Sequence, residues 1–414
     1  ALDGIGALVV GAVVAYHLHV PWFDGGLLGV SVFFTLSGYL ITSLLIQGYE
    51  RRGRIELKAF WGRRARRLLP ALLLMLPVVS VTAAIARPEK LAATLRQVLC
   101  ALLYVANWTT IARGDDYFQR FTGPGPLDHL WSLAIEEQFY IVWPLVVLAA
   151  LWLGARRGRA LLALVTVALA AGSTWAIAHL YHPNAFNNTR AYEGTDARAA
   201  SLLVGALAAT AIPFERVREI TGRWRAGLDL AGAIGLAGVA VCVARSDEYS
   251  PFLYRGGEVS LAIFTVILSV AAAHPQTLVA RALGLAPLRW IGARSYGIYL
   301  WHLPVVAFMP ASVLVRQPLA RGAVQVALIV ALAALSYRLI EDPIRRRTAR
   351  PVRARWGLAF RAVALVPLAT VALVVWPLSC RVPTEVEALA SEPIPTSVVV
   401  APAVDAIFAP PPAG

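Results

Sequence analysis

The sequence has little charge and little cysteine for its length. Only 15% of its 414 residues are Asp, Glu, Lys or Arg, whereas soluble domains carry about 25%. The three cysteines, Cys100, Cys242 and Cys380, are scattered without metal-ligand spacing or a disulfide framework. No glycine-rich nucleotide loop, zinc spacing or serine-nucleophile elbow is present. The sequence therefore argues against a soluble single-core domain, and we predict no metal site.

Long apolar runs take the place of charge, since 58% of the residues are hydrophobic. A helix needs about 20 apolar residues to cross a bilayer. The runs predict eleven spans, near 2–20, 27–47, 67–86, 135–154, 160–180, 199–213, 227–244, 258–273, 296–315, 321–340 and 359–378. A further apolar stretch, 91–108, includes Arg96 and Asn107 and predicts one interfacial or re-entrant helix. The predicted fold class is all-α, a polytopic transmembrane helical bundle.

The basic residues predict how the chain is oriented. The formal net charge is +14, which in a soluble protein would suggest nucleic acid, but in a membrane protein Lys and Arg mark cytoplasmic loops. With the 49–67 loop inside, 24 of the 38 Lys and Arg fall in inner loops and 12 in outer segments. We therefore predict a multi-pass protein of the bacterial cytoplasmic membrane, with its N-terminus inside, its C-terminus outside and no nucleic-acid partner.

Both ends suggest a longer chain. The sequence starts without Met or a basic leader, so we expect its numbering to begin inside a longer one. The last residues, 391–414, are rich in Pro and Ala and nearly uncharged, which is typical of an extended linker. Because linkers normally lead to another domain, we hypothesise an extracytoplasmic domain after residue 414.

Two groups of side chains could carry chemistry at opposite ends of the membrane. His17 lies toward the outer end of the first span and could act as a general base, although a structural histidine is an equal alternative. Arg63, Arg64 and Arg67 share one helix face, where guanidinium forks suit phosphates; anionic lipid headgroups are the alternative partner. At ~1.5 Å rise per residue the two groups lie roughly 15 to 25 Å apart.

The segment 127–144 crowds His129, Trp131, Glu136 and Glu137 at the predicted outer mouth of a span. Carboxylates entering an apolar span are costly unless they are paired or functional. Adjacent residues face about 100° apart on a helix, so we expect one of the two glutamates to point into the bundle. An aromatic belt with a salt bridge is the alternative interpretation.

Two further clusters are candidates for substrate binding. The predicted outer loop before residue 199 carries Arg190, Asp196 and Arg198, which could line an acceptor pocket or could be ordinary loop charge. The segment 293–305 brings Tyr299 and His302 together. Tyr at headgroup level is usually an anchor, but His302 lies nearly one turn deeper and is harder to explain in that way.

The order of these motifs carries a resemblance. The motifs are LDGIGAL at 2–8, YH at 16–17, GVSVFFTLSGYLIT at 29–42, RRARRLLP at 63–70, WSLAIEEQFY at 131–140, TDARAASLLVGAL at 195–207, SYGIYLWHLP at 295–304 and SYRLIEDPIRR at 336–346. They resemble the membrane acyltransferase-3 family over about residues 1–345. Within it, the chain is similar to bacterial O-acetyltransferases whose membrane domain is followed by an extracytoplasmic SGNH-type domain.

The resemblance implies an organisation and an activity. It implies about ten core helices in an acyltransferase domain at 1–345, an extra span at 346–380 and a linker at 381–414 leading to an SGNH domain. It also implies acetyl-CoA, or another acyl-CoA, as a cytosolic donor and a cell-surface glycan or glycolipid as acceptor. His17 matches the essential histidine of the family, and Glu137 matches an acid of its EEQFY motif. Arg63, Arg64 and Arg67 match the motif thought to meet the CoA phosphates.

Two positions depart from the family pattern. Gly6 stands where relatives usually have an Arg eleven residues before the essential histidine, and Ser31 stands where they often have Asp.

We therefore expect an integral membrane O-acyltransferase with His17, Glu136 and Glu137 as catalytic candidates. Trp131 joins Arg190, Asp196, Arg198, Tyr299 and His302 as a substrate-binding candidate, and membrane lipids are expected partners. The alternatives are a transporter or flippase of a glycan or lipid, and a degenerate family member that acts as a scaffold.

Overall fold

The structure is a computed structural model, and it describes residues 1–114, 125–183, 187–213, 217, 224–247, 250–309 and 317–346. The predicted eleventh span and the C-terminal linker lie outside these ranges. Within them the chain is helical between short turns and contains no β-strand. The all-helical class is therefore confirmed.

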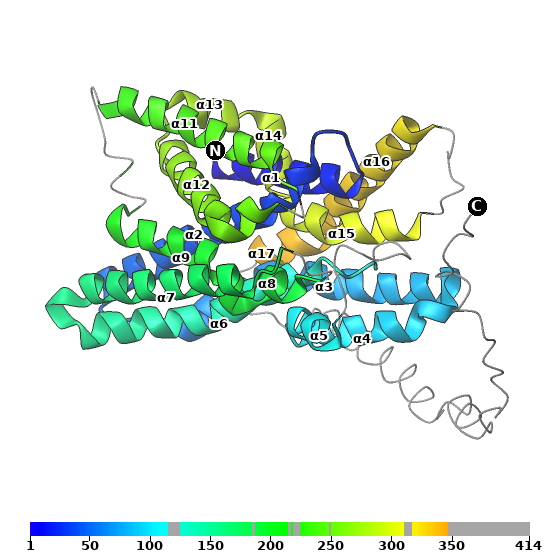
Figure 1. Cartoon of the computed structure of the whole chain (residues 1–414), viewed down its shortest axis with the longest axis horizontal. Helices are drawn as coiled ribbons and strands as arrows, with labels where there is room; N and C mark the ends of the chain where they lie inside the picture. The colour runs from blue at the N-terminus through cyan, green and yellow to red at the C-terminus, as the bar shows by residue number, and fades with distance from the viewer. Residues whose placement is uncertain are drawn as a thin grey trace, which may run out of the picture. The chain divides into compact units, whose positions relative to one another are not determined.

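Ten helices correspond to the first ten predicted spans (Figure 1). They are α1 (Leu2–His17), α2 (Gly29–Arg52), α3 (Leu57–Ala86), α6 (Leu130–Leu153), α7 (Gly158–Leu180), α9 (Thr195–Ala211), α11 (Trp224–Arg245), α12 (Glu258–Ala273), α15 (Ser295–Phe308) and α16 (Pro318–Ser336). In the described residues, seven helical segments are long and apolar enough to cross a membrane. Because α1, α9 and α15 have only 16, 17 and 14 residues, the count of about ten core spans stays a prediction.

Shorter elements connect these helices. They are η1 (Asp24–Leu28), η2 (Pro88–Lys90), α4 (Leu91–Leu102), α5 (Ala106–Arg113), η3 (Ala155–Arg157), α8 (Thr189–Glu193), η4 (Leu253–Gly257), α13 (Leu278–Leu283), α14 (Ala286–Gly292), η5 (Tyr337–Glu341) and α17 (Asp342–Arg346).

The prediction of one helix over 91–108 was wrong, because the stretch forms two helices, α4 and α5. The break follows from Tyr104, whose φ of +54° lies in the left-handed region that cannot continue a right-handed helix. Two other helices start earlier than their apolar runs. α3 begins at Leu57 and α6 at Leu130, because Arg, Lys, Leu and Glu favour helix even where the hydropathy is low.

Two glycines bring α2 and α9 into backbone contact at the centre of the bundle. A Cβ added at Gly38 would lie 1.8 Å from the Leu202 carbonyl oxygen, and one added at Gly205 would lie 2.0 Å from the Thr35 carbonyl oxygen. Small residues allow this close approach in membrane helices. Helix α9 also packs against α7, and both α2 and α9 pack against α12. In Figure 1, α6 and α7 run side by side.

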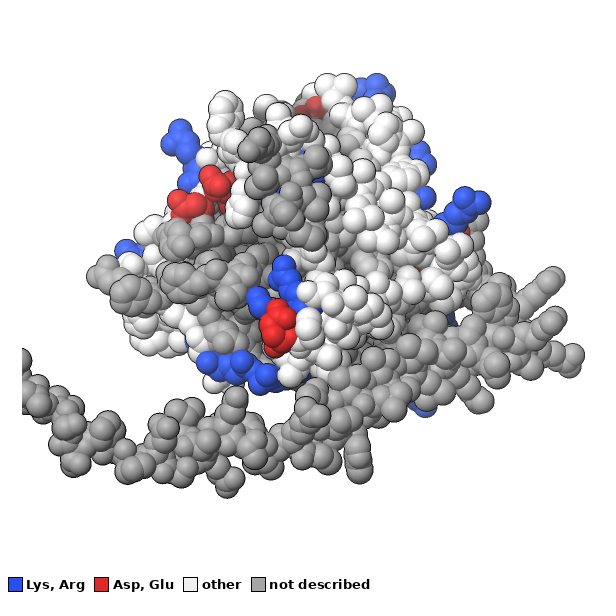
Figure 2. Space-filling view, turned by 90° about the vertical axis from the view of Figure 1, so that its right-hand side faces the viewer, with Lys and Arg blue, Asp and Glu red and all other residues white. Residues whose placement is uncertain are grey.

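The surface agrees with an apolar surrounding. Figure 2 shows a face on which broad uncharged areas separate small groups of charged side chains. Large apolar side chains such as Trp152, Trp175 and Leu164 are 73%, 66% and 67% exposed. In a soluble protein such exposure would promote association, whereas lipid covers it in a membrane protein.

Candidate active site

A cavity of about 460 Å³ lies between α1, α2, α3, α6 and α15. Apolar side chains of α2, among them Phe33, Phe34 and Leu40, form one wall. Polar side chains come from the facing helices: Arg64 and Arg67 of α3, Ser132, Glu136 and Tyr140 of α6, and Tyr296 and Tyr299 of α15. A pocket with apolar walls and a few convergent polar groups is the usual form of a small-molecule site.

The arginine end of the cavity is built on α3 and α6. The Arg64 guanidinium lies 3.9 Å from the centre of the Tyr140 ring, a cation–π contact that fixes its direction. The Glu136 carboxylate accepts hydrogen bonds from Ser37 and Tyr140. Arg64 and Arg67 line the cavity, whereas Arg63 is exposed and is not part of the lining. Two of the three guanidinium groups on the predicted helix face therefore line the cavity.

Of the two adjacent glutamates, Glu136 lines the cavity and Glu137 does not. This division agrees with the expected angle between neighbouring helical positions. Glu137 is half-buried, and its buried Oε1 has no hydrogen-bond partner among the described residues. The resemblance assigns the acid of the motif to Glu137, but the cavity favours Glu136 as the group nearer to a bound molecule.

Three histidines from distant parts of the chain meet at the other end of this region. The His302 ring centre lies 4.8 Å from that of His17 and 5.0 Å from that of His129. His129 is 1% exposed and His302 is 0% exposed. His17 ends α1, His129 precedes α6 and His302 lies in α15. The sequence singled out each residue, but it did not predict that they form one cluster.

Backbone carbonyls assign the tautomers of two of these rings. His17 Nδ1 is 2.9 Å from the Val13 carbonyl oxygen, and His302 Nδ1 is 2.5 Å from that of Tyr299. Because a carbonyl only accepts, each Nδ1 carries the proton and each Nε2 keeps its lone pair. His302 Nε2 is buried without a hydrogen-bond partner among the described residues. The His17 and His302 rings therefore each keep an Nε2 lone pair, and His302 holds its lone pair in the buried part of the cluster.

Tyr299 separates the cavity from the histidines. Its ring centre is 5.2 Å from those of His129 and His302, and its hydroxyl lines the cavity side with Ser132 at 2.6 Å. The same hydroxyl donates to the His129 carbonyl oxygen at 2.9 Å. Ser132 and Tyr140 are about 12 Å apart along α6, at ~1.5 Å per residue. His17 itself is not among the lining residues. Tyr299 is therefore the residue that contacts both the cavity and the histidine cluster.

The predicted acceptor residues do not form one pocket. Arg198 is 0% exposed and donates to Glu258, which is 1% exposed, and to Ser31 Oγ at 2.8 Å. Ser201 donates to the other oxygen of Glu258 at 2.6 Å. This buried cluster joins α2, α9 and η4–α12. Ser31, the second departure from the family pattern, is thus a direct partner of Arg198.

Trp131 belongs to the same packed region. It is 2% exposed and packs against Tyr192, with ring centres 5.0 Å apart, below the Arg198 guanidinium at 5.8 Å. Its role in substrate binding, and that of Arg198, stays a prediction.

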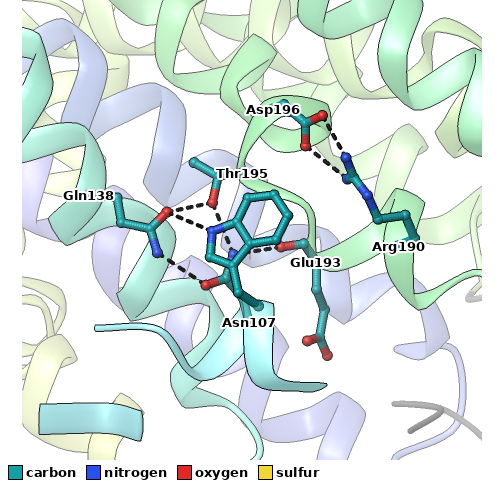
Figure 3. A network of polar contacts seen from close by, with 7 residues as sticks. Asn107, Gln138, Arg190, Glu193, Thr195 and Asp196 are labelled. Carbon is teal, nitrogen blue, oxygen red and sulfur yellow. Dashed lines mark hydrogen bonds and ion pairs between the residues drawn. The ribbon is translucent and has the colours of Figure 1, made fainter. Parts of the chain in front are cut away.

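Arg190 and Asp196 lie apart from that cluster, in the network of Figure 3. Arg190 donates to both Asp196 oxygens, at 2.8 and 2.7 Å, and stands 5.3 Å from the Trp108 ring. Asp196 precedes the predicted span at 199–213. The hydrogen bonds from Arg190 hold the pKa of the Asp196 carboxyl below its usual value. Beside this pair, Asn107 donates to the Glu193 carbonyl oxygen and to Thr195 Oγ1 at 3.0 and 2.9 Å, and accepts from Gln138 at 3.1 Å. These bonds attach the short helix α5 to α6 and α9.

No described group of three or more His, Cys, Asp or Glu side chains has an arrangement that could hold a metal ion. The site therefore offers arginine, carboxylate, hydroxyl and imidazole groups, which suit binding of an anionic donor followed by proton or acyl transfer.

Comparison with known proteins gives three informative relatives. A peptidoglycan O-acetyltransferase, OatA, of Listeria monocytogenes is 42% identical over 84% of this chain and 56% of its own length. A putative peptidoglycan O-acetyltransferase, YrhL, of Bacillus subtilis is 39% identical over 83% and 54%. An O-acetyltransferase, OatA, of Staphylococcus aureus is 37% identical over 88% and 58%. The chain spans somewhat more than half the length of these relatives. No solved structure matches it.

The acyltransferase domain family matches residues 1–339, which include every residue of the cavity and of the histidine cluster. On this match the chain belongs to the acyltransferase-3 family.

Proposed function

We propose that the chain is an integral membrane O-acyltransferase. It moves an acetyl group from cytosolic acetyl-CoA to a hydroxyl of peptidoglycan or a related cell-envelope glycan. The names of the relatives support the reaction and the class of acceptor. The observation that carries the proposal is the cavity that leads from Arg64 and Arg67 to Tyr299, beside the three histidines.

The cavity suits the donor. Arg64 and Arg67 lie on the side that the basic loops predict to be cytoplasmic, where their guanidinium forks bind the CoA phosphates. The apolar α2 wall accommodates the flexible arm of CoA, while Ser132 and Glu136 offer hydrogen-bond partners to its amides. The thioester then comes to rest near Tyr299. This arrangement brings the reacting carbon to the histidine cluster while the charged end stays near the cytoplasm.

The proposed step transfers one acyl group and one proton. His17 Nε2 removes the proton of the acceptor hydroxyl, and the acceptor oxygen attacks the thioester carbonyl carbon. The C–S bond breaks, an ester C–O bond forms, and the CoA sulfur leaves with the proton that His17 returns. His302 is in ring contact with His17 and stabilises the His17 imidazolium that forms between the two proton transfers. A covalent acyl-His17 intermediate is the variant of this scheme that the residues equally allow.

The wider organisation belongs to the same proposal. Residues 1–345 form the membrane domain, 346–380 supply an extra span, and 381–414 lead to an SGNH-type domain outside the cell. Glu136 and Glu137 balance the charge of the arginine end. Trp131 and His302 contribute to the acceptor side, and Arg190 and Asp196 shape its outer rim.

CoA release from acetyl-CoA by the purified protein tests the donor half of the reaction. We expect His17→Ala to abolish release. Arg64→Ala should raise KM for acetyl-CoA by roughly 10- to 100-fold, because a hydrogen bond to a charged group is worth about 1.5–3 kcal/mol. Arg66→Ala is the matched control, since Arg66 lies on the same helix but does not line the cavity. Thermal stability of each variant separates a binding effect from unfolding. Absence of thioester cleavage in the wild type, with or without glycan, would refute the proposal and favour a transporter.

A further inference from the structure

The loop that joins α1 to η1 holds an aromatic side chain in an unusual conformation. The loop starts directly after His17 and makes a four-residue turn over 20–23, in which Phe23 N–H donates to the Val20 carbonyl oxygen at 3.2 Å. Pro21 and Trp22 occupy its centre, and Trp22 has a φ of +74°. The third position of a turn with positive φ is normally glycine or asparagine. A bulky residue there is an outlier.

The chain directly after this loop is held by close backbone packing. A Cβ added at Gly25 would lie 1.9 Å from the Val243 carbonyl oxygen, and one added at Gly26 would lie 2.2 Å from that of Ala12. These glycines place the loop backbone directly on α11 and α1. His19 also has a positive φ, of +52°. That of His19 belongs to the ordinary end of α1, where His19 N–H donates to the Tyr16 carbonyl oxygen at 2.9 Å and Val20 N–H donates to that of Ala15 at 3.0 Å. A bulky residue held in the left-handed region, as Trp22 is, persists only when the surrounding structure determines it, and such positions concentrate at functional sites.

The conformation displays Trp22 instead of burying it. Its side chain is 89% exposed, and the neighbouring His19 and Asp24 are exposed as well. In the sequence, His19 precedes Trp22 by three residues and Asp24 follows it by two. An indole with an imidazole and a carboxylate on the same short loop suits a sugar, whose C–H face stacks on the ring while its hydroxyls bond to the polar groups. A tryptophan that only anchors a protein in headgroups gains nothing from a rigid, strained backbone. A binding platform does gain, because rigidity lowers the entropy lost on binding.

We propose that Trp22 is the platform for the acceptor glycan. One sugar ring stacks on the Trp22 indole, Asp24 and His19 bond its hydroxyls, and the neighbouring sugar of the chain then presents its hydroxyl toward His17. This assignment rests on the proposed function and names an uncharged pyranose face of an amino-sugar chain as the part recognised. No residue of the donor cavity takes part in it.

The test measures binding of a soluble probe, a hexamer of β-1,4-linked N-acetylglucosamine, to the full chain in detergent. Trp22→Gly should weaken binding by about tenfold or more, because it removes the whole indole surface, and tryptophan is enriched among the residues that dominate binding at protein interfaces. The same substitution should raise the unfolding temperature, because glycine is relaxed at a φ of +74°. Trp22→Phe should retain binding at an intermediate level. Trp152→Ala, which removes a 73% exposed tryptophan at the end of α6, should bind as the wild type does.

Opposite changes in binding and stability would support the platform, since loss of a merely structural tryptophan lowers both. Wild-type binding by Trp22→Gly, or no binding by the wild type, would overturn it. Loss of stability in phospholipid vesicles but not in detergent, with binding unchanged, would identify a lipid anchor and also overturn it. CoA release by the wild type, measured with and without glycan, separates the two proposals. If the wild type binds the glycan hexamer but does not cleave acetyl-CoA, the Trp22 platform stands and the proposed function is refuted. If it cleaves acetyl-CoA but does not bind the hexamer, the proposed function stands and the platform is refuted.

Discussion

Replacing Glu258 with glutamine should destabilise this protein far more than the loss of an exposed ion pair. Glu258 is the carboxylate partner of the fully buried Arg198, and it also accepts a hydrogen bond from Ser201 at 2.6 Å. Glutamine keeps the size of the side chain and removes its charge. The glutamine amide has one acceptor oxygen in place of two, so either Arg198 or Ser201 loses its acceptor, and the Arg198 guanidinium loses the charge that balances it in this cluster.

The size of the effect follows from burial. A guanidinium and a carboxylate that are 0% and 1% exposed have both lost their hydration, and removing one partner of such a pair costs about 3–5 kcal/mol. Replacing both partners by apolar residues leaves no uncompensated charge and is often neutral or stabilising. We therefore expect Glu258→Gln to lower the free energy of unfolding by about 3–5 kcal/mol, and Arg198→Met with Glu258→Leu to recover most of that loss.

Unfolding of the purified protein in mixed micelles, followed by circular dichroism, measures these differences. Arg190→Met is the matched control, because its partner Asp196 is half exposed and the pair is screened by water. That control should cost about 0–1 kcal/mol. A loss below about 1 kcal/mol for Glu258→Gln, or a double variant less stable than Glu258→Gln, would refute the reasoning from an uncompensated buried charge.

Three other substitutions test the packing and the cavity. Gly38→Ala should lower the free energy of unfolding by about 1–3 kcal/mol because its Cβ would meet the Leu202 carbonyl at 1.8 Å. Gly48→Ala, in the same helix with no atom within 4 Å, should be neutral or slightly stabilising in the same unfolding assay. Asn107→Ala should cost about 1–3 kcal/mol, since it leaves buried partners without their hydrogen bonds; unfolding curves equal to the wild type would contradict this. Gly6→Arg should lower KM for acetyl-CoA about tenfold, the value of one charged hydrogen bond, because a side chain there enters the cavity with 3.5 Å to its nearest neighbour. Gly6→Leu, which adds bulk without charge, should raise KM in the same CoA-release assay, and equal effects of the two would contradict the electrostatic reason.

The helical class, the ten helices and the arginine face follow from local features of the sequence. They depend on apolar run length and 3.6-residue spacing. Of Arg63, Arg64 and Arg67, which were predicted to share one helix face, Arg64 and Arg67 line the cavity and Arg63 does not. Hydropathy does not predict where a helix begins if the helix extends into charged residues, as at the start of α3. It also fails where a single backbone conformation breaks an apolar run, as at Tyr104.

The composition of the site depends on contacts between distant segments, which spacing does not reveal. His129 was visible as a histidine at a membrane boundary, but its contact with His302 depends on the tertiary placement of the residue before α6 beside α15, where Tyr299 donates to the His129 carbonyl oxygen. Glu258 gave one signal, an acidic residue at the mouth of an apolar run, where an unpaired charge is costly. That signal predicts that a partner exists, but it does not identify Arg198.

The glycine contact between α2 and α9 bears on how the molecule moves. Transporters that work by alternating access rock one helix bundle against another, so some seam between helices has to slide. A slide of one turn along α2 would bring Phe34 or Thr42 against the α9 backbone where only hydrogen now fits at Gly38. We therefore expect α2 and α9 to move together as one unit. We therefore expect any movement of Tyr299 to come from α15 and not from sliding of α2 along α9, which fits an enzyme with a fixed site better than a transporter that works by rocking.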